Sequence, residues 1–355
     1  MMKKIRVLVV DDSAFMRKII SDMLSSNPEI EVVGTAADGR EALAKVSSLD
    51  PDVVTMDLDM PLMDGITALK HIMKVDPKPV IMVSAFTYDG AEETIKSLNS
   101  GAVDFVTKPD RRRVSFRMKD AQEELIKKIK SSAKANMFSS TELSKCKQSS
   151  KKKKKKPLAV EAENVVVIGA STGGPKTLCK IMSKLPTKID AAVIVVQHMP
   201  PKFTLTLASW LDSLTSLPVV EARDGEMVTK GKVFIAPGGF HLKVKKEKVN
   251  DGIHRIMRLD KGPMVNGMRP SIDVTMSSVA QAYTGKVVGV ILTGMGHDGT
   301  EGMKQIKRMG GRTISQDEDT SIISSMPKSA FESGAVDEVV SLPEISKKIL
   351  ELISS

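Results

Sequence analysis

The fold is decided by one stretch of the sequence, Val165-Val166-Val167-Ile168-Gly169-Ala170-Ser171-Thr172-Gly173-Gly174-Pro175. Its four β-favouring apolar residues lead into a turn of small residues, and such a run bounded by glycine predicts a strand buried on both faces of a parallel sheet. Pro175 predicts the first turn of a helix. We therefore expect Ser171 at a strand-to-helix corner, where outward N–H groups can stabilise an oxyanion.

Residues 169–173 also fit the G-x-S-x-G pattern of serine hydrolases. The pattern is short, so a phosphate-binding glycine-rich turn or an ordinary tight loop stays open at this point. The rest of the chain must decide between them.

The bulk composition bounds the class of protein. A length of 355 residues predicts two or three domains. No stretch approaches the ~20 apolar residues of a membrane span, and the N-terminus lacks a signal-peptide pattern. The two cysteines, Cys146 and Cys179, make no disulfide framework and favour a reducing compartment. We expect a cytoplasmic protein without direct membrane insertion.

The net charge of +10 comes largely from one block, Lys151 to Lys156. A block of like charges repels itself and is typical of a solvated linker. Elsewhere the chain shows no recognition helix and no basic-aromatic interleaving, so we expect no nucleic-acid partner.

Residues 5–108 alternate between strand and helix patterns, with strands predicted at 5–10, 32–33, 53–56, 80–83 and 103–106. This alternation predicts a doubly wound five-strand α/β unit. In such a sheet, ligands bind outside the carboxyl ends of the strands.

Five polar residues follow those strand ends: Asp11, Asp12, Asp57, Ser84 and Lys108. Converging carboxylates repel one another, so we expect a hard divalent cation there, Mg²⁺, held by oxygen ligands. The carboxylate of Asp57 is then a candidate nucleophile toward a phosphoryl donor. Lys108 and Ser84 are candidates to pair with the added phosphate.

This arrangement resembles the flavodoxin-like receiver domain of bacterial response regulators. The resemblance rests on Asp11-Asp12, Met56-Asp57-Leu58-Asp59-Met60-Pro61, Ser84-Ala85 and Lys108-Pro109. It implies that Asp57 is phosphorylated, that the backbone of Asp59 joins the metal ligands, and that Phe105 is the switch aromatic.

The second half of the chain resumes the alternation from residue 164, after a polar segment. We predict a receiver domain at 1–122, a linker at 123–158 comprising a helix end and a Lys-rich mobile segment, and a catalytic domain at 159–355. The catalytic domain is predicted to be a doubly wound, mainly parallel α/β fold. Short strands between 219 and 259 predict a hairpin insertion.

Ser171, His198 and Asp298 each follow a buried strand of this second half. Strand ends of a parallel sheet share one edge, so the three residues can meet as nucleophile, general base and orienting carboxylate. The chain order Ser, His, Asp differs from that of α/β-hydrolases. His297 and His241 are rival bases, ranked below His198 because His297 adjoins Asp298 and His241 lies in a hairpin-like segment.

The second half is similar to the catalytic domain of the chemotaxis protein-glutamate methylesterase family, the CheB family. The shared motifs are residues 169–175, Gln197 to Pro200, Ala236 to His241, Arg269 to Asp273, Thr293 to Gly299 and Ser315 to Asp317. A receiver followed by this domain is the family's architecture.

The resemblance implies a phosphorylation-activated serine hydrolase that demethylates glutamate methyl esters on chemotaxis receptors and deamidates receptor glutamines. It assigns the triad to Ser171, His198 and Asp298, places Thr172 beside the nucleophile and gives the backbone of Met295 an oxyanion role. The implied partners are methyl-accepting receptors as substrate and a chemotaxis histidine kinase as phosphodonor. Mg²⁺ is implied at the receiver, and no cofactor at the hydrolase site.

A rival from another class is a non-catalytic, phosphorylation-switched binding regulator. The lysine run favours it, whereas the three strand-end residues favour the hydrolase. Modification of Ser171 by a serine-reactive phosphonate separates the two.

Overall fold

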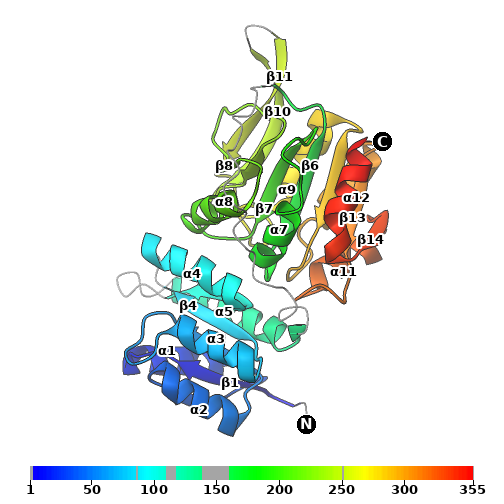
Figure 1. Ribbon diagram of the computed structural model, residues 1–355. Helices are drawn as coiled ribbons and strands as arrows, with labels where there is room; N and C mark the ends of the chain where they lie inside the picture. Colours follow the sequence, from blue (N-terminus) through cyan, green and yellow to red (C-terminus); the bar gives the residue numbers. More distant parts are fainter. Residues whose placement is uncertain (1–2, 85–86, 109–116, 138–159, 250–251, 355) are drawn as a thin grey trace. The chain divides into compact units, whose positions relative to one another are not determined.

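The computed structural model describes residues 3–84, 87–108, 117–137, 160–249 and 252–354. The chain divides into two compact units, Met1–Lys145 and Cys146–Ser355 (Figure 1). Among the described residues no helix has the length and apolar content needed to cross a membrane. The lysine run predicted to be a mobile linker lies outside the described residues.

The first unit is a parallel sheet of five strands in the order β2-β1-β3-β4-β5. Its strands are β1 (Ile5–Val10), β2 (Ile30–Ala36), β3 (Val53–Asp57), β4 (Val80–Ser84) and β5 (Asp104–Thr107). Its helices are α1 (Ala14–Ser25), α2 (Gly39–Leu49), α3 (Gly65–Val75), α4 (Tyr88–Ser100) and α5 (Arg117–Ser132). The predicted five-strand receiver fold is confirmed.

Local sequence explains where these helices begin. The side chains of Ser13, Asp38, Asp64 and Thr87 accept hydrogen bonds from N–H groups in the first turns of α1 to α4. These are the residue types that satisfy the free N–H groups at a helix start. The cap at Ser13 begins α1 directly after Asp11 and Asp12, so it holds the acidic pair at the end of β1.

Helix α5 packs against the apolar core of the first unit, to which it belongs. Leu125 and Ile129 are buried in the same apolar core as residues of β1, β3 and β4. Gln122 donates to the carbonyl of Met23 at 3.1 Å and to the hydroxyl of Ser26 at 2.7 Å.

The second unit contains a seven-stranded sheet in the order β14-β13-β12-β6-β7-β9-β8, and every pairing in it is parallel. Its strands are β6 (Val165–Ala170), β7 (Ala192–Gln197), β8 (Val219–Glu221), β9 (Val233–Ile235), β12 (Val287–Ile291), β13 (Arg312–Gln316) and β14 (Glu338–Val340). Its helices are α7 (Gly174–Met182), α8 (Phe203–Leu214), α9 (Ile272–Tyr283), α10 (Thr300–Arg308), α11 (Ser325–Glu332) and α12 (Leu342–Ser354). Figure 1 shows α7 and α12 on one face of the sheet and α9 on the other.

The predicted hairpin insertion is an antiparallel pair, β10 (His241–Val249) and β11 (Gly252–Asp260). It projects from the second unit as a two-stranded arm (Figure 1). At its base, Leu242 and Val244 are buried in the main core of the unit.

The central strands explain how this fold positions a site. All six residues of β6 and all six of β7 are buried, as expected for strands covered on both faces. β6 lies between β12 and β7, so the segments that follow these three strands are neighbours at one edge of the sheet.

The cysteines differ from expectation. Cys179, on α7, is disulfide-bonded. From the sequence we expect no disulfide framework and a reducing compartment, because the two cysteines are scattered. The bond partner lies outside the described residues.

Candidate functional site

Ser171 occupies the corner between β6 and α7. Its N–H donates to the carbonyl of Thr293 at 3.0 Å, which ties the corner to the segment after β12. Its own carbonyl accepts from the N–H of Gly174 at 2.8 Å and from the side-chain amide of Gln197 at 2.9 Å. The main chain of the corner is thus held on both sides, while the serine side chain remains half-buried.

His198 follows β7 directly and is held beside the same corner. Its N–H donates to the carbonyl of Ala170 at 3.1 Å. Its Nε2 lies 2.8 Å from Oδ2 of Asp298, and the two side chains are 6% and 4% exposed. Its other ring nitrogen, Nδ1, is buried and has no hydrogen-bond partner among the described residues.

This arrangement fixes the chemical state of the ring. An ionised carboxylate only accepts hydrogen bonds, so Nε2 carries the proton when the imidazole is neutral. Nδ1 is then the basic nitrogen. Among the described residues no hydrogen bond joins it to the hydroxyl of Ser171; the link between His198 and the Ser171 corner is the main-chain bond to Ala170.

Asp298 is held by several donors besides His198. Its Oδ1 accepts from the hydroxyl of Ser271 at 2.9 Å and from the N–H of Asp273 at 3.1 Å. Its Oδ2 accepts from the N–H of Ile272 at 2.7 Å. Burial alone would raise the pKa of Asp298, but the hydrogen bonds from His198 and from the start of α9 lower that pKa below its ordinary value. Asp298 is therefore a firmly ionised partner for the imidazole.

The predicted oxyanion residues lie on the two loops that flank this corner. Thr172 is buried, and its carbonyl accepts from the hydroxyl of Thr293 at 3.0 Å. Met295 is half-buried, and its N–H donates no hydrogen bond within the described part of the chain. The N–H groups on either side are used within the loop, Gly294 to Ile323 at 2.9 Å and Gly296 to the hydroxyl of Ser325 at 3.1 Å.

The rival histidines have other surroundings. His241 is 2% exposed, with Nε2 2.9 Å from the carbonyl of Pro263 and Nδ1 accepting from the N–H of Ser271. His297 is exposed, and its side chain makes no hydrogen bond or ion pair with the other described residues. Of these three histidines, His198 alone touches Asp298.

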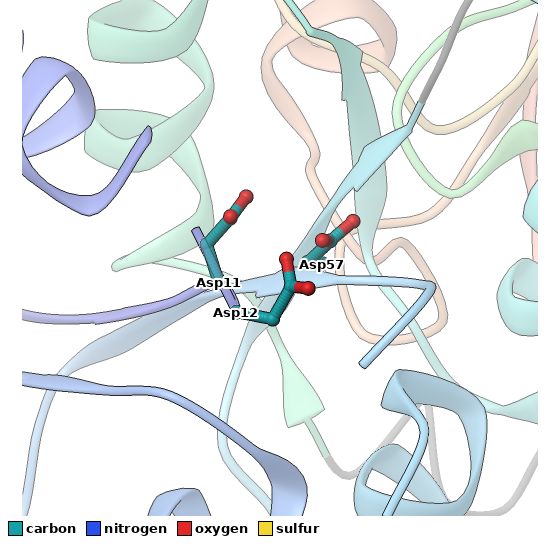
Figure 2. Close-up of side chains that lie close together, drawn as sticks. All are labelled: Asp11, Asp12 and Asp57. Atoms are coloured by element: carbon teal, nitrogen blue, oxygen red, sulfur yellow. The ribbon is translucent and has the colours of Figure 1, made fainter. Parts of the chain in front are cut away.

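A second candidate site lies at the edge of the first unit. Figure 2 shows the carboxylates of Asp11 and Asp12, after β1, beside that of Asp57 at the end of β3. One oxygen from each lies within 4.8 Å of the others. Lys108 reaches in from the end of β5, with Nζ 2.6 Å from Oδ2 of Asp57 and 3.0 Å from Oδ2 of Asp11.

The donor set fits a hard divalent cation. All three side chains offer carboxylate oxygens, the ligands that Mg²⁺ prefers, and Asp12 is exposed whereas Asp11 and Asp57 are buried. Burial raises the pKa of Asp57 from 3.8 to about 6, against the lowering effect of Lys108. A cation there would favour the ionised, nucleophilic carboxylate.

The other predicted receiver residues surround this cluster. Ser84 is buried at the end of β4, and its hydroxyl donates to the carbonyl of Gly90 at 3.1 Å. Asp59 is exposed, two residues beyond Asp57. Phe105 is 3% exposed and lies under the ammonium of Lys128, 5.2 Å from the ring centre. Phe105, which the sequence resemblance implies is the switch aromatic, is thus buried in this structure.

Sequence reasoning gave no role to Gln197, Ser271 or Asp273. Gln197 bonds the carbonyl of the Ser171 corner, and Ser271 and Asp273 belong to the start of α9 that holds Asp298. Their one signal in the sequence was membership of the motifs from Gln197 to Pro200 and from Arg269 to Asp273.

Comparison with known proteins matches each of the two units to a protein family. The CheB methylesterase family model matches residues 166–349, and the response regulator receiver domain model matches residues 7–117. The chain is 47% identical over 352 residues to the protein-glutamate methylesterase/protein-glutamine glutaminase of Pyrococcus abyssi, covering 99% of this chain and 94% of that protein. It is also 47% identical over 349 residues to the Thermotoga maritima protein of the same name, covering 98% of each.

A solved structure agrees with these matches. The catalytic domain of Thermotoga maritima CheB methylesterase aligns with 54% of this chain and 100% of its own length, at 46% identity and a TM-score of 0.51. The chain therefore belongs to the CheB methylesterase family and carries that family's catalytic domain behind a response regulator receiver domain.

Proposed function

We propose that this chain is a phosphorylation-activated serine hydrolase that converts glutamate methyl esters on chemotaxis receptors to glutamate and methanol. The same route would deamidate receptor glutamines. The observation that carries the proposal is the buried His198–Asp298 pair beside the Ser171 corner, at the ends of three neighbouring strands. Relatives that match nearly the whole chain bear the names of both activities.

In the proposed reaction, the hydroxyl of Ser171 attacks the ester carbonyl while Nδ1 of His198 takes its proton. Asp298 stabilises the imidazolium through Nε2–H. The N–H of Met295, which donates no hydrogen bond among the described residues, would stabilise the developing oxyanion together with the backbone beside Thr172. His198 then protonates the departing methoxide, which leaves as methanol.

The second half of the reaction regenerates the enzyme. Nδ1 of His198 takes a proton from water as the water attacks the ester formed on Ser171. Ser171 recovers its proton from the imidazolium, and the receptor keeps a glutamate carboxylate. With a glutamine substrate, ammonia leaves in place of methanol.

The receiver unit is proposed to control this activity. Asp57 accepts a phosphoryl group from a chemotaxis histidine kinase or from acetyl phosphate, and Lys108 and Ser84 pair with the new phosphate oxygens. Asp11, Asp12, Asp57 and the backbone of Asp59 would hold Mg²⁺, and the bound ion would supply positive charge beside the phosphoryl group. We place the reaction in the cytoplasm, where kinase and receptor signalling regions meet.

The proposal is tested by labelling and by substrate turnover. A fluorophosphonate should modify Ser171, identified by peptide mass spectrometry, and the chain should release methanol from methylated receptor membranes. In H₂¹⁸O the label should enter the glutamate carboxyl group and not the methanol, because the acyl–oxygen bond breaks. A folded chain that neither reacts with the fluorophosphonate nor releases methanol would leave the binding-regulator alternative.

A further inference from the structure

The start of α9 and the start of α10 exchange hydrogen bonds through two carboxylates. Asp298, in the loop before α10, accepts from Ser271, Ile272 and Asp273 at the start of α9. Asp273, in the first turn of α9, accepts from the N–H groups of Gly299 at 2.9 Å and Gly302 at 2.7 Å at the start of α10. Each helix is thus capped by a carboxylate from the other's segment.

Helix α10 depends on this exchange. Its own N-cap residue is Gly299, which has a φ of 102° and no side chain to accept a hydrogen bond. The first N–H groups of a helix need partners from elsewhere, and a carboxylate there also favours the helix dipole. Asp273 supplies that partner from a neighbouring helix.

The consequence falls on the catalytic site, because Gly299 is the residue after Asp298. A bond that fixes the N–H of Gly299 fixes the peptide that carries the Asp298 side chain. The direction in which Asp298 meets His198 then depends on Asp273, although Asp273 has no recorded bond to His198.

We propose that Asp273 is a positioning residue of the hydrolase, acting through Asp298 by clamping the start of α10 against the start of α9. The proposal rests on the proposed function and adds a fourth side chain to its machinery. It also accounts for the Arg269-to-Asp273 motif, whose aspartate is not used in the reaction itself.

Charged and titratable groups surround Asp273, so a change at this residue should alter the pH dependence of activity. Asp298 faces it from the α10 loop, with His198 bonded beyond. Lys243 and Lys245 of β10 line the same cavity of about 430 Å³ as Asp273, His241 accepts from the neighbouring Ser271, and Glu301 pairs with Lys304 on the exposed side of α10. Burial, with the charge of Asp298, raises the pKa of Asp273 to about 6.

At neutral pH Asp273 therefore adds a second negative charge beside Asp298. Removing that charge should move the acidic limb of the pH profile of kcat/KM to lower pH. A residue that only supports folding would change the height of the profile without moving its limb.

The test compares Asp273→Ala and Asp273→Asn in the full-length chain with the control Asp337→Ala. Asp337 is an exposed residue of the same unit, whose carboxylate accepts from the N–H and the hydroxyl of Thr313 on β13 at 2.9 Å each and pairs with Lys307 in the last turn of α10 at 3.0 Å, away from the start of that helix. Asparagine at 273 keeps an oxygen for Gly299 and Gly302 but removes the charge. The measurements are kcat and KM for methanol release, the pH profile, fluorophosphonate labelling and thermal unfolding.

We expect Asp273→Ala to lower kcat by roughly 10- to 100-fold at nearly constant KM, since small misplacements of catalytic groups cost that much. Asp273→Asn should recover kcat to within about three-fold at high pH, with its acidic limb displaced to lower pH. Asp337→Ala should lose thermal stability without this loss of kcat.

Equal kcat losses in Asp273→Ala and Asp337→Ala, or wild-type kcat in Asp273→Ala, would overturn the proposal. If Asp273→Ala does not fold, the pH profile of Asp273→Asn decides alone, and an unmoved acidic limb refutes the role. Failure of the wild type to label or to release methanol refutes the proposed function instead. A wild type that does both, with Asp273 variants that match it, refutes only this inference.

Discussion

At the scale of the residue, the central feature is which nitrogen of His198 faces Asp298. The 2.8 Å contact uses Nε2, and within the described part of the chain the buried Nδ1 has no hydrogen-bond partner, so Nδ1 is the nitrogen that we propose accepts the serine proton. His241 has both ring nitrogens in contact with backbone groups, so it lacks a free basic nitrogen in this structure.

His198→Ala should therefore lower turnover by roughly 10⁴- to 10⁶-fold with folding retained, because the nucleophile loses its base. His297→Ala, in the exposed neighbour of Asp298, serves as the control and should stay near the wild-type rate. Methanol release from methylated receptors measures both. A severe His297→Ala with a mild His198→Ala would show that the base is assigned to the wrong histidine.

The ionised carboxylate of Asp57 should lower the free energy of unfolding in a pH-dependent way. Its pKa rises from 3.8 to about 6 on folding, so the folded state binds the proton more tightly than the unfolded state does. The free energy of unfolding then falls as pH rises through this window. Relative to Asp57→Asn, the wild type should lose about 1.4 kcal/mol between pH 5 and pH 7.5 without Mg²⁺.

Urea denaturation of the receiver transition in EDTA measures this effect at the two pH values. Asp12→Asn is the control, since Asp12 belongs to the same cluster but is exposed. If the difference in unfolding free energy between Asp57→Asn and the wild type did not change with pH, burial of the Asp57 charge would not be its cause.

At the scale of the element, hydrophobic patterning predicted the strands that are buried on both faces of a sheet. Val165 to Ile168 and Val193 to Val196 are continuous apolar runs because both faces of β6 and β7 are covered, and the next residues reach the sheet edge. Ser171, His198 and Asp298 were predicted as site residues for that reason, as were Asp57 and Lys108.

The residues of the site that were not predicted lie on elements whose contact the hydrophobic pattern does not reveal. Ser271 and Asp273 begin a helix, and nothing in a single sequence shows that this helix start touches the loop before α10. Strand order is also absent from the pattern, so the central place of β6 between β12 and β7 emerged only with the structure.

The loop after β12 should tolerate no added side chain at Gly294. A Cβ there would lie 2.3 Å from Sδ of Met326 and 2.7 Å from Cβ of Ser171. Gly294→Ala should destabilise the unit by about 1–3 kcal/mol through overpacking and should also lower kcat by displacing the Ser171 corner.

Chemical denaturation and methanol release test that variant beside Gly262→Ala. At Gly262 the nearest atom to an added Cβ is a side-chain oxygen of Asp260, at 3.3 Å, so that change should be mild. Wild-type stability and kcat in Gly294→Ala would show that the loop yields more easily than the contacts indicate.

At the scale of the whole molecule, two compact units carry two chemistries, a carboxylate cluster in one and the serine site in the other. Acetyl phosphate with Mg²⁺ should raise methanol release by the intact chain roughly 5- to 150-fold, the range of a typical coupling free energy. Asp57→Asn or EDTA should abolish the response.

A fragment comprising residues 160–355 is the control for that experiment, because the homologous catalytic domain has been solved by itself. The fragment should release methanol at a rate that acetyl phosphate does not change. If acetyl phosphate raised methanol release by the fragment, or raised it as much in Asp57→Asn as in the wild type, regulation would not depend on the receiver site.

The central claim is that Ser171 performs the ester hydrolysis, and the initial rate of methanol release by Ser171→Ala tests it most directly. Assayed on methylated receptor membranes beside the wild type, the folded variant should lose roughly 10⁴- to 10⁶-fold in turnover. A folded Ser171→Ala chain that releases methanol within about ten-fold of the wild-type rate would contradict the account, because a lost nucleophile costs far more than that.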